Sequence, residues 1–231
     1  MGGCDGRAAA AHSSFRGAMS CPICEHRKPA RYCPARGDSI CTICCGQERE
    51  VTLDCPHDCI YLIRAREQEE AHRRPVPPGE LPFPGVELPT GVLDLNRALL
   101  AALGTTILGF VAEAPRLNDA DVAAALHALA ETYRTLTSGL IYEKPPQGGP
   151  ARDLYVKLRD AVQELKKEQL ARAALPVAKD SDVLYIAVFL ARVLRARSNG
   201  RPRCRAFLDF LRAQFPQAAP AEKDAPRIIV P

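Results

Sequence analysis

Residues 21–59 decide the fold of this chain, and they read CPICEHRKPARYCPARGDSICTICCGQEREVTLDCPHDC. Eight of the ten cysteines in the 231-residue chain fall in this stretch. They are Cys21, Cys24, Cys33, Cys41, Cys44, Cys45, Cys55 and Cys59. Zinc held by thiolates takes four ligands in a tetrahedral arrangement, so eight thiols match two zinc ions. The sequence therefore predicts a small zinc-binding module, which we place at residues 19–63.

The spacing of the cysteines predicts how they divide between two ions. A Cys-x-x-Cys pair turns two sulfurs toward one point, and both Cys21/Cys24 and Cys41/Cys44 have this spacing. One arrangement uses every sulfur, because the remaining four cysteines then form a second set. The two sets are Cys21, Cys24, Cys41 and Cys44, and Cys33, Cys45, Cys55 and Cys59. His57 is an alternative ligand that would replace Cys44, Cys45 or Cys59.

This stretch resembles the cross-brace zinc fingers of the MYND and HIT type, in which alternate ligand pairs hold two zinc ions. The resemblance covers about 40 of the 231 residues. The chain departs from those families in the adjacent Cys44 and Cys45, in the isolated Cys33 and in the order Cys-x-His-x-Cys at 55–59. In those families the finger contacts protein partners. The resemblance therefore implies a protein partner for this chain.

Other uses of the cysteines lead to different expectations. Four thiolates also suit an iron–sulfur cluster, and Cys21-Pro-Ile-Cys24 has the spacing of a redox pair. A disulfide framework would need an exported protein. Residues 1–18 contain no apolar run of the kind found in secretory signals, so we expect a disordered leader there and a cytoplasmic protein with reduced thiols.

Apolar residues at three- and four-residue steps predict an all-α domain over residues 91–215. The first stripe is Leu95, Leu99, Leu103, Ile107 and Phe110. Four further helices are expected at about 118–138, 150–175, 183–197 and 202–215. Asn118 or Asp119 is expected to cap the helix near 118–138, and Asp180 or Ser181 the helix near 183–197. The Asp-x-Asp-Val sequences at 119–122 and 180–183 each open a helix, and two helical hairpins related by duplication would explain this echo.

The remaining segments are predicted to connect or flank these two parts. Residues 64–90 combine a charged helix with a proline-rich linker, and residues 216–231 form a disordered tail. The longest apolar window, 98–112, is about 15 residues, which is shorter than the roughly 20 needed to span a bilayer. It predicts a core helix, and no membrane association is expected.

Late arginines offer a second candidate site. The net charge is only +4, but basic residues crowd around one loop between two predicted helices. They are Arg192, Arg195, Arg197, Arg201, Arg203 and Arg205. This patch is either a solvated surface or an anion site for nucleic acid. No catalytic signature is present, so the sequence predicts a non-enzymatic protein with no small-molecule substrate.

Overall fold

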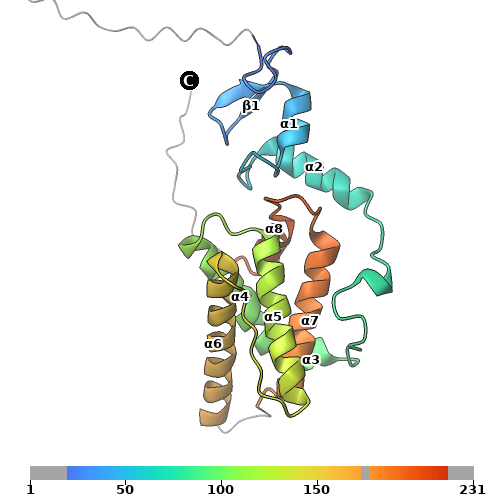
Figure 1. Ribbon diagram of the computed structural model, residues 1–231, viewed down its shortest axis with the longest axis vertical. Coiled ribbons are helices and arrows are strands. Elements are labelled where there is room, and N and C mark those ends of the chain that lie inside the picture. Colours follow the sequence, from blue (N-terminus) through green and yellow to red (C-terminus); the bar gives the residue numbers. More distant parts are fainter. Residues whose placement is uncertain (1–19, 173–176, 218–231) are drawn as a thin grey trace, which may run out of the picture.

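The computed structural model describes residues 20–172 and 177–217. The predicted leader, Cys4 and the tail beyond Gln217 lie outside these ranges. The described chain is mostly helical, as predicted. In Figure 1 the cysteine-rich region, residues 20–59, lies at one end of a helical body that contains α4 to α8. The helices are α1 (Thr42–Glu48), α2 (Ile60–Ala71), α3 (Val92–Leu95), α4 (Arg97–Glu113), α5 (Asp119–Thr137), α6 (Gly149–Ala171), α7 (Asp180–Arg197) and α8 (Ala206–Gln214).

The two strands in the described ranges form a small antiparallel hairpin within the cysteine-rich region. Strand β1 (Arg31–Cys33) pairs with β2 (Asp38–Ile40), so that Arg31 lies opposite Ile40. The intervening turn contains Gly37 with φ +69°, a left-handed conformation that glycine adopts without steric cost. The hairpin brings the start of β1 and the end of β2 close together, and β2 leads directly into α1.

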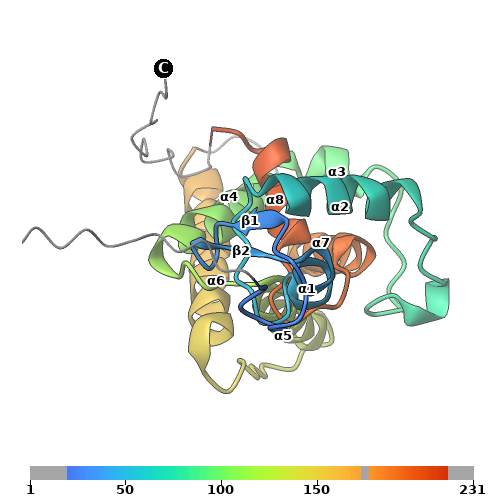
Figure 2. The ribbon, with the colours of Figure 1, turned by 90° about the horizontal axis from the view of Figure 1, so that it is seen from above.

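Helix α5 is the central element of the helical body. It packs along α7 and α6, and α4 packs against α6. The predicted stripes supply the core, since Leu103, Leu126 and Leu158 are fully buried together with most of their helical neighbours. Figure 2, seen from above, shows the hairpin and α1 over the end of this bundle, with α2 along one side. None of the helices in the described ranges is long and apolar enough to cross a bilayer.

The structure corrects three details of the predicted helices. Leu95 does not join the core stripe and is 85% exposed, because the chain breaks at Asn96 into two helices. The side-chain amide of Asn96 donates to the carbonyl of Val92 and closes the short α3. The last helix begins at Ala206 instead of Pro202.

Helix α7 is capped differently from the prediction, which assigned Asp180 or Ser181. Its N-cap is Lys179, and the carboxylate of Asp182 accepts a hydrogen bond from the Lys179 amide at 2.9 Å. Helix α5 has the predicted cap, since the side chain of Asn118 accepts from the amides of Ala120 and Asp121. The amide of Asn118 donates in return to the carboxylate of Asp121 at 3.2 Å. Reciprocal bonds of this kind satisfy the free N–H groups of a first turn.

The proline-rich segment packs against the helical body. It contains one 3₁₀ turn, η1 (Pro78–Glu80). Phe83, Val86 and Leu88 then contact the hydrophobic core. We call residues 75–90 the strap, because side chains of α7 hold it in place.

Candidate metal centre

Four cysteine sulfurs meet at one point in the cysteine-rich region. Cys21 and Cys24 come from the loop before β1, Cys41 is the N-cap of α1, and Cys44 lies in its first turn. Their Sγ atoms all lie within 4.8 Å of one another. Among the residues that the structure describes, no other set of three or more Cys, His, Asp or Glu side chains meets this distance. The cluster contains the first of the two ligand sets predicted from the spacing.

Local turns bring each Cys-x-x-Cys pair into position. The amide of Cys21 donates to the carbonyl of Arg27, and the amide of Glu25 donates to the carbonyl of Cys21. Glu25 adopts φ +57° to complete this turn. At the second pair, the Cys41 sulfur accepts a hydrogen bond from the Cys44 amide at 3.3 Å. Backbone N–H groups in both turns also point at ligand sulfurs, since those of Ile23 and Cys24 approach the Cys21 sulfur and that of Cys44 approaches the Cys41 sulfur.

The electrostatics of the cluster favour a bound cation. Burial raises the pKa of the Cys21 thiol, but the backbone N–H groups of Cys41, Cys24 and Ile23 outweigh burial and lower it to about 6. Burial and the three neighbouring sulfurs raise the pKa of Cys44 to about 12. Four adjacent thiolates repel one another, so a central cation is needed to keep all of them ionised.

The geometry also matches a single tetrahedral ion. A Zn–S bond of about 2.3 Å places tetrahedral sulfurs about 3.8 Å apart, and the sulfurs of Cys24 and Cys41 are 3.9 Å apart. The nine cysteines within the described ranges are all unpaired, so no disulfide joins them there. Cys21, Cys41 and Cys44 are buried and Cys24 is half-buried. The residues present therefore fit a structural metal ion.

The second predicted ligand set is less closely gathered. Cys33 ends β1, Cys45 lies on α1, and Cys59 is the N-cap of α2. Burial raises the pKa of the Cys55 thiol, and the charges of Cys59 and Cys33 raise it further, so these three side chains share one neighbourhood. The guanidinium of Arg31 donates to the Cys45 sulfur at 3.7 Å. A second ion at these four sulfurs stays a prediction.

The two remaining residues of interest lie away from the four-sulfur cluster. His57 lines a cavity of about 220 Å³ between the cysteine-rich region and the helical body, together with Cys55 and Arg66. Cys204 is buried before α8, and burial raises the pKa of its thiol to about 11. Cys204 is therefore an interior residue beside Asp119 and Glu50.

Three of the predicted arginines lie on α7 and bind segments that precede α3. Arg192 is the most deeply engaged, because its guanidinium donates three hydrogen bonds to main-chain carbonyls of the strap. The acceptors are Pro82 (3.1 Å), Phe83 (2.6 Å) and Val86 (2.7 Å) for Arg192, Glu80 (3.3 Å) for Arg195, and Glu70 (3.0 Å) for Arg197. These arginines attach the strap and α2 to the helical body.

The other three arginines surround the loop between α7 and α8. The Arg201 guanidinium donates to the carbonyls of Gly46 and Arg49 at the end of α1, at 3.0 and 2.6 Å. Arg205 pairs with the carboxylate of Asp54 at 3.0 Å. Arg203 differs from both, since its exposed guanidinium has no partner in the described part of the chain. Two of these three arginines thus bind the cysteine-rich region.

Sequence reasoning missed Glu50, the acidic residue at the centre of this contact. Glu50 is 2% exposed, and its carboxylate accepts from Arg66 at 2.6 Å and from Asn199 at 3.0 Å. The main-chain amide of Arg205 donates to the same carboxylate, and the amide of Arg203 donates to the Glu50 carbonyl. We call these contacts the Glu50 network. No sequence signal marks Glu50, because most of its partners lie about 150 residues away.

Comparison with protein-family models, curated proteins and solved structures finds no match for this chain. The resemblance to MYND and HIT fingers therefore depends on cysteine spacing alone. The geometry itself defines a four-sulfur cluster that fits a metal ion, attached to a helical body through buried polar contacts.

Proposed function

We propose that the chain is a non-enzymatic zinc-finger protein that presents its cysteine-rich region to a protein partner. The observation that carries this proposal is the four-sulfur cluster of Cys21, Cys24, Cys41 and Cys44. Four protein ligands complete the coordination of zinc, which leaves no position for water or substrate. The ion then has a structural role. Its binding free energy, about 10–16 kcal/mol for structural sites in small fingers, stabilises a region with few apolar residues.

Zinc fits this cluster better than an iron–sulfur cluster does. The ligands of a polynuclear cluster bind different iron atoms, which holds their sulfurs further apart than the ligands of one ion. Here all four sulfurs lie within 4.8 Å of one another. We extend the proposal to a second zinc ion at Cys33, Cys45, Cys55 and Cys59, with His57 as the alternative ligand. Reduced thiolates of this kind suit the cytoplasm.

Exposed apolar side chains on the cysteine-rich region and the helix that follows it support a protein partner. Tyr32 on β1 is 60% exposed and Ile60 on α2 is 57% exposed, and Ile43 on α1 is also exposed. Arg31, which precedes Tyr32 in the chain, places its guanidinium 4.6 Å from the centre of the Tyr61 ring. Exposed aromatic and aliphatic side chains held on a rigid frame are typical anchors of protein interfaces.

A matched pair of surface variants tests the interface. The full chain and its Ile43→Glu variant are each used to capture proteins from a cell extract, and any protein retained only by the unchanged chain is purified and titrated calorimetrically. We expect Ile43→Glu to weaken binding at least about tenfold. Leu170→Glu serves as the control, because Leu170 is exposed on α6. If the captured protein binds the Ile43→Glu variant or the metal-free chain as tightly as it binds the unchanged chain, the proposed interface is contradicted.

A second candidate function is nucleic-acid binding, favoured by one cavity. Arg203, Arg116 and Arg205 line a hollow of about 480 Å³ with Asp54 and Asn118. The guanidinium groups of Arg116 and Arg203 have no partner in the described part of the chain. The test is binding of labelled single- and double-stranded nucleic acid at several salt concentrations. Affinity unchanged by Arg203→Glu would exclude this candidate.

A further inference from the structure

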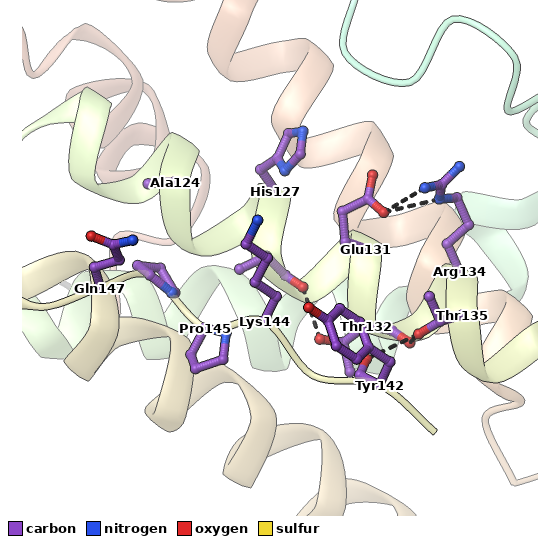
Figure 3. A pocket seen from close by; sticks show the side chains of 12 residues that line it. Ala124, His127, Glu131, Thr132, Arg134, Thr135, Tyr142, Lys144, Pro145 and Gln147 are labelled. Carbon is purple, nitrogen blue, oxygen red and sulfur yellow. Dashed lines mark hydrogen bonds and ion pairs between the residues drawn. The ribbon is translucent and has the colours of Figure 1, made fainter. Parts of the chain in front are cut away.

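A cavity on the helical body, remote from the cysteines, has the features of a ligand site. It has a volume of about 580 Å³ and lies between the outer face of α5 and the segment 142–147 that follows it. Ligand pockets in proteins commonly measure about 300–1,000 Å³, with apolar walls and a few polar groups. Figure 3 shows the lining side chains of this cavity.

The walls of the cavity present apolar groups because their hydroxyls are already bonded within the protein. The hydroxyl of Thr132 contacts the carbonyl of Ala128 at 2.9 Å and the hydroxyl of Tyr155 at 3.1 Å. The hydroxyl of Thr135 is shared between the carbonyl of Thr132 at 2.8 Å and the carbonyl of Tyr142 at 3.0 Å. These two threonines and Ala128 line the space opposite the segment that contains Pro145 and Pro146, and the threonine hydroxyl groups are already satisfied.

The opposite wall is held in place without a ligand. Thr135 anchors the segment twice, through its hydroxyl to the Tyr142 carbonyl and through its own carbonyl, which accepts from the amide of Leu140 at 2.9 Å. The adjacent Pro145 and Pro146 restrict the backbone after this anchor. The cavity is thus preformed, which reduces the entropy cost of binding.

The charges at the rim determine which ligand fits. The only carboxylate among the lining residues is Glu131, and Arg134 neutralises it through two hydrogen bonds of 3.1 and 2.7 Å. The ammonium of Lys144 has no ion pair or hydrogen bond with the described residues. In Figure 3 its side chain extends toward the part of the cavity where His127 lies. His127 packs against Phe83 of the strap, with ring centres 4.7 Å apart. The rim therefore offers an unpaired cation and an imidazole.

We propose that this cavity binds a small amphipathic carboxylate, a function beyond the protein interaction proposed above. The apolar chain of the ligand lies against Ala128, the threonine methyl groups and Pro145. Its carboxylate accepts hydrogen bonds from the ammonium of Lys144 and from an N–H of His127. A neutral ligand would leave Lys144 without a partner, and a cationic ligand would be repelled.

Octanoate is the probe, and octan-1-ol and octylamine are its uncharged and cationic counterparts. Each compound is titrated into the full-length, zinc-loaded protein while ¹H–¹⁵N chemical shifts are recorded. We expect octanoate to give saturable shifts at 124–135 and 142–147, with octan-1-ol at least about tenfold weaker, as for the loss of a charge-assisted hydrogen bond. Octylamine should bind most weakly. Equal affinity for octanoate and octan-1-ol would overturn the proposal.

Variants at exposed positions separate the cavity from nonspecific binding. Lys144→Gln should weaken octanoate at least about tenfold, and Ala124→Phe should abolish binding by filling the space. Lys167→Gln is the charge-matched control, since Lys167 lies exposed on α6, and it should leave the affinity unchanged. Octanoate binding that survives Ala124→Phe would contradict the assignment. The assignment would also be contradicted if deletion of residues 218–231 changed the chemical shifts of the cavity amides in the absence of ligand. In that case the chain itself would occupy the cavity.

Discussion

Replacement of Glu50 should separate the cysteine-rich region from the helical body. Its buried carboxylate accepts from Arg66, Asn199 and the amide of Arg205. In Glu50→Ala these donors lose their shared acceptor, although Arg66 keeps its ion pair with Asp209. Breaking a buried pair by removing one partner costs about 3–5 kcal/mol. Because Arg66 retains Asp209, we expect the lower end, about 3 kcal/mol of unfolding free energy. Glu50→Gln keeps the shape but not the charge and should cost about 1.5–3 kcal/mol.

Urea unfolding and amide hydrogen exchange measure this effect together. Exchange should accelerate at α1, at residues 199–205 and at the start of α2, while the interior of α5 stays protected until global unfolding. Glu48→Gln is the matched control, because Glu48 contributes only an exposed hydrogen bond from Thr52. It should change stability by less than about 0.5 kcal/mol. If Glu50→Ala costs no more than this control, the carboxylate does not join the two parts and the reasoning fails.

Two further predictions concern single side chains. Arg201→Met should cost about 1–3 kcal/mol in urea unfolding, because the part-buried carbonyls of Gly46 and Arg49 lose their donor. Arg203→Met is the control, because Arg203 lies in the same loop but its side chain has no partner in the described ranges. It should cost less than about 0.5 kcal/mol. Equal effects of the two changes would contradict the assigned contacts. Burial raises the pKa of Asp119 from 3.8 to about 6, although the amide of Phe207 opposes this shift. The folded state therefore binds the proton more tightly, so stability should fall by up to about 3 kcal/mol as pH rises from about 4 to 6. Asp119→Asn should remove this dependence of stability on pH. If the difference in unfolding free energy between the two proteins stays constant across that pH range, the assignment is refuted.

The four-sulfur cluster was predictable because its ligands follow local rules. Two Cys-x-x-Cys turns each orient their own sulfurs, so spacing alone predicted the cluster that the structure forms from Cys21, Cys24, Cys41 and Cys44. The helices of the body were predictable for the same reason. Their apolar residues recur about once per helical turn, so a few neighbouring positions are enough to reveal the pattern. Residues such as Leu99 and Leu154 are buried as expected.

The roles of the arginines were not predictable, because their partners are distant in sequence. Arg201 binds carbonyls of α1 more than 150 residues away, and Arg192 binds the strap more than 100 residues away. Clustering in the sequence left open a solvated surface or an anion site. The structure instead gives most of these guanidinium groups acceptors within the chain. The break at Asn96 was also hidden, since the apolar spacing continues through it while Leu95 turns outward.

The account depends on coordination chemistry at residues 20–59, and metal content tests it most directly. Full-length protein purified without oxygen is analysed for metals by mass spectrometry, alongside its visible absorption spectrum and its ¹H–¹⁵N spectrum. We predict at least one zinc ion per chain, no iron and no visible absorption, with loss of the amide signals of residues 20–59 when a strong chelator removes the metal. Metal-free protein that keeps those signals dispersed would contradict the account.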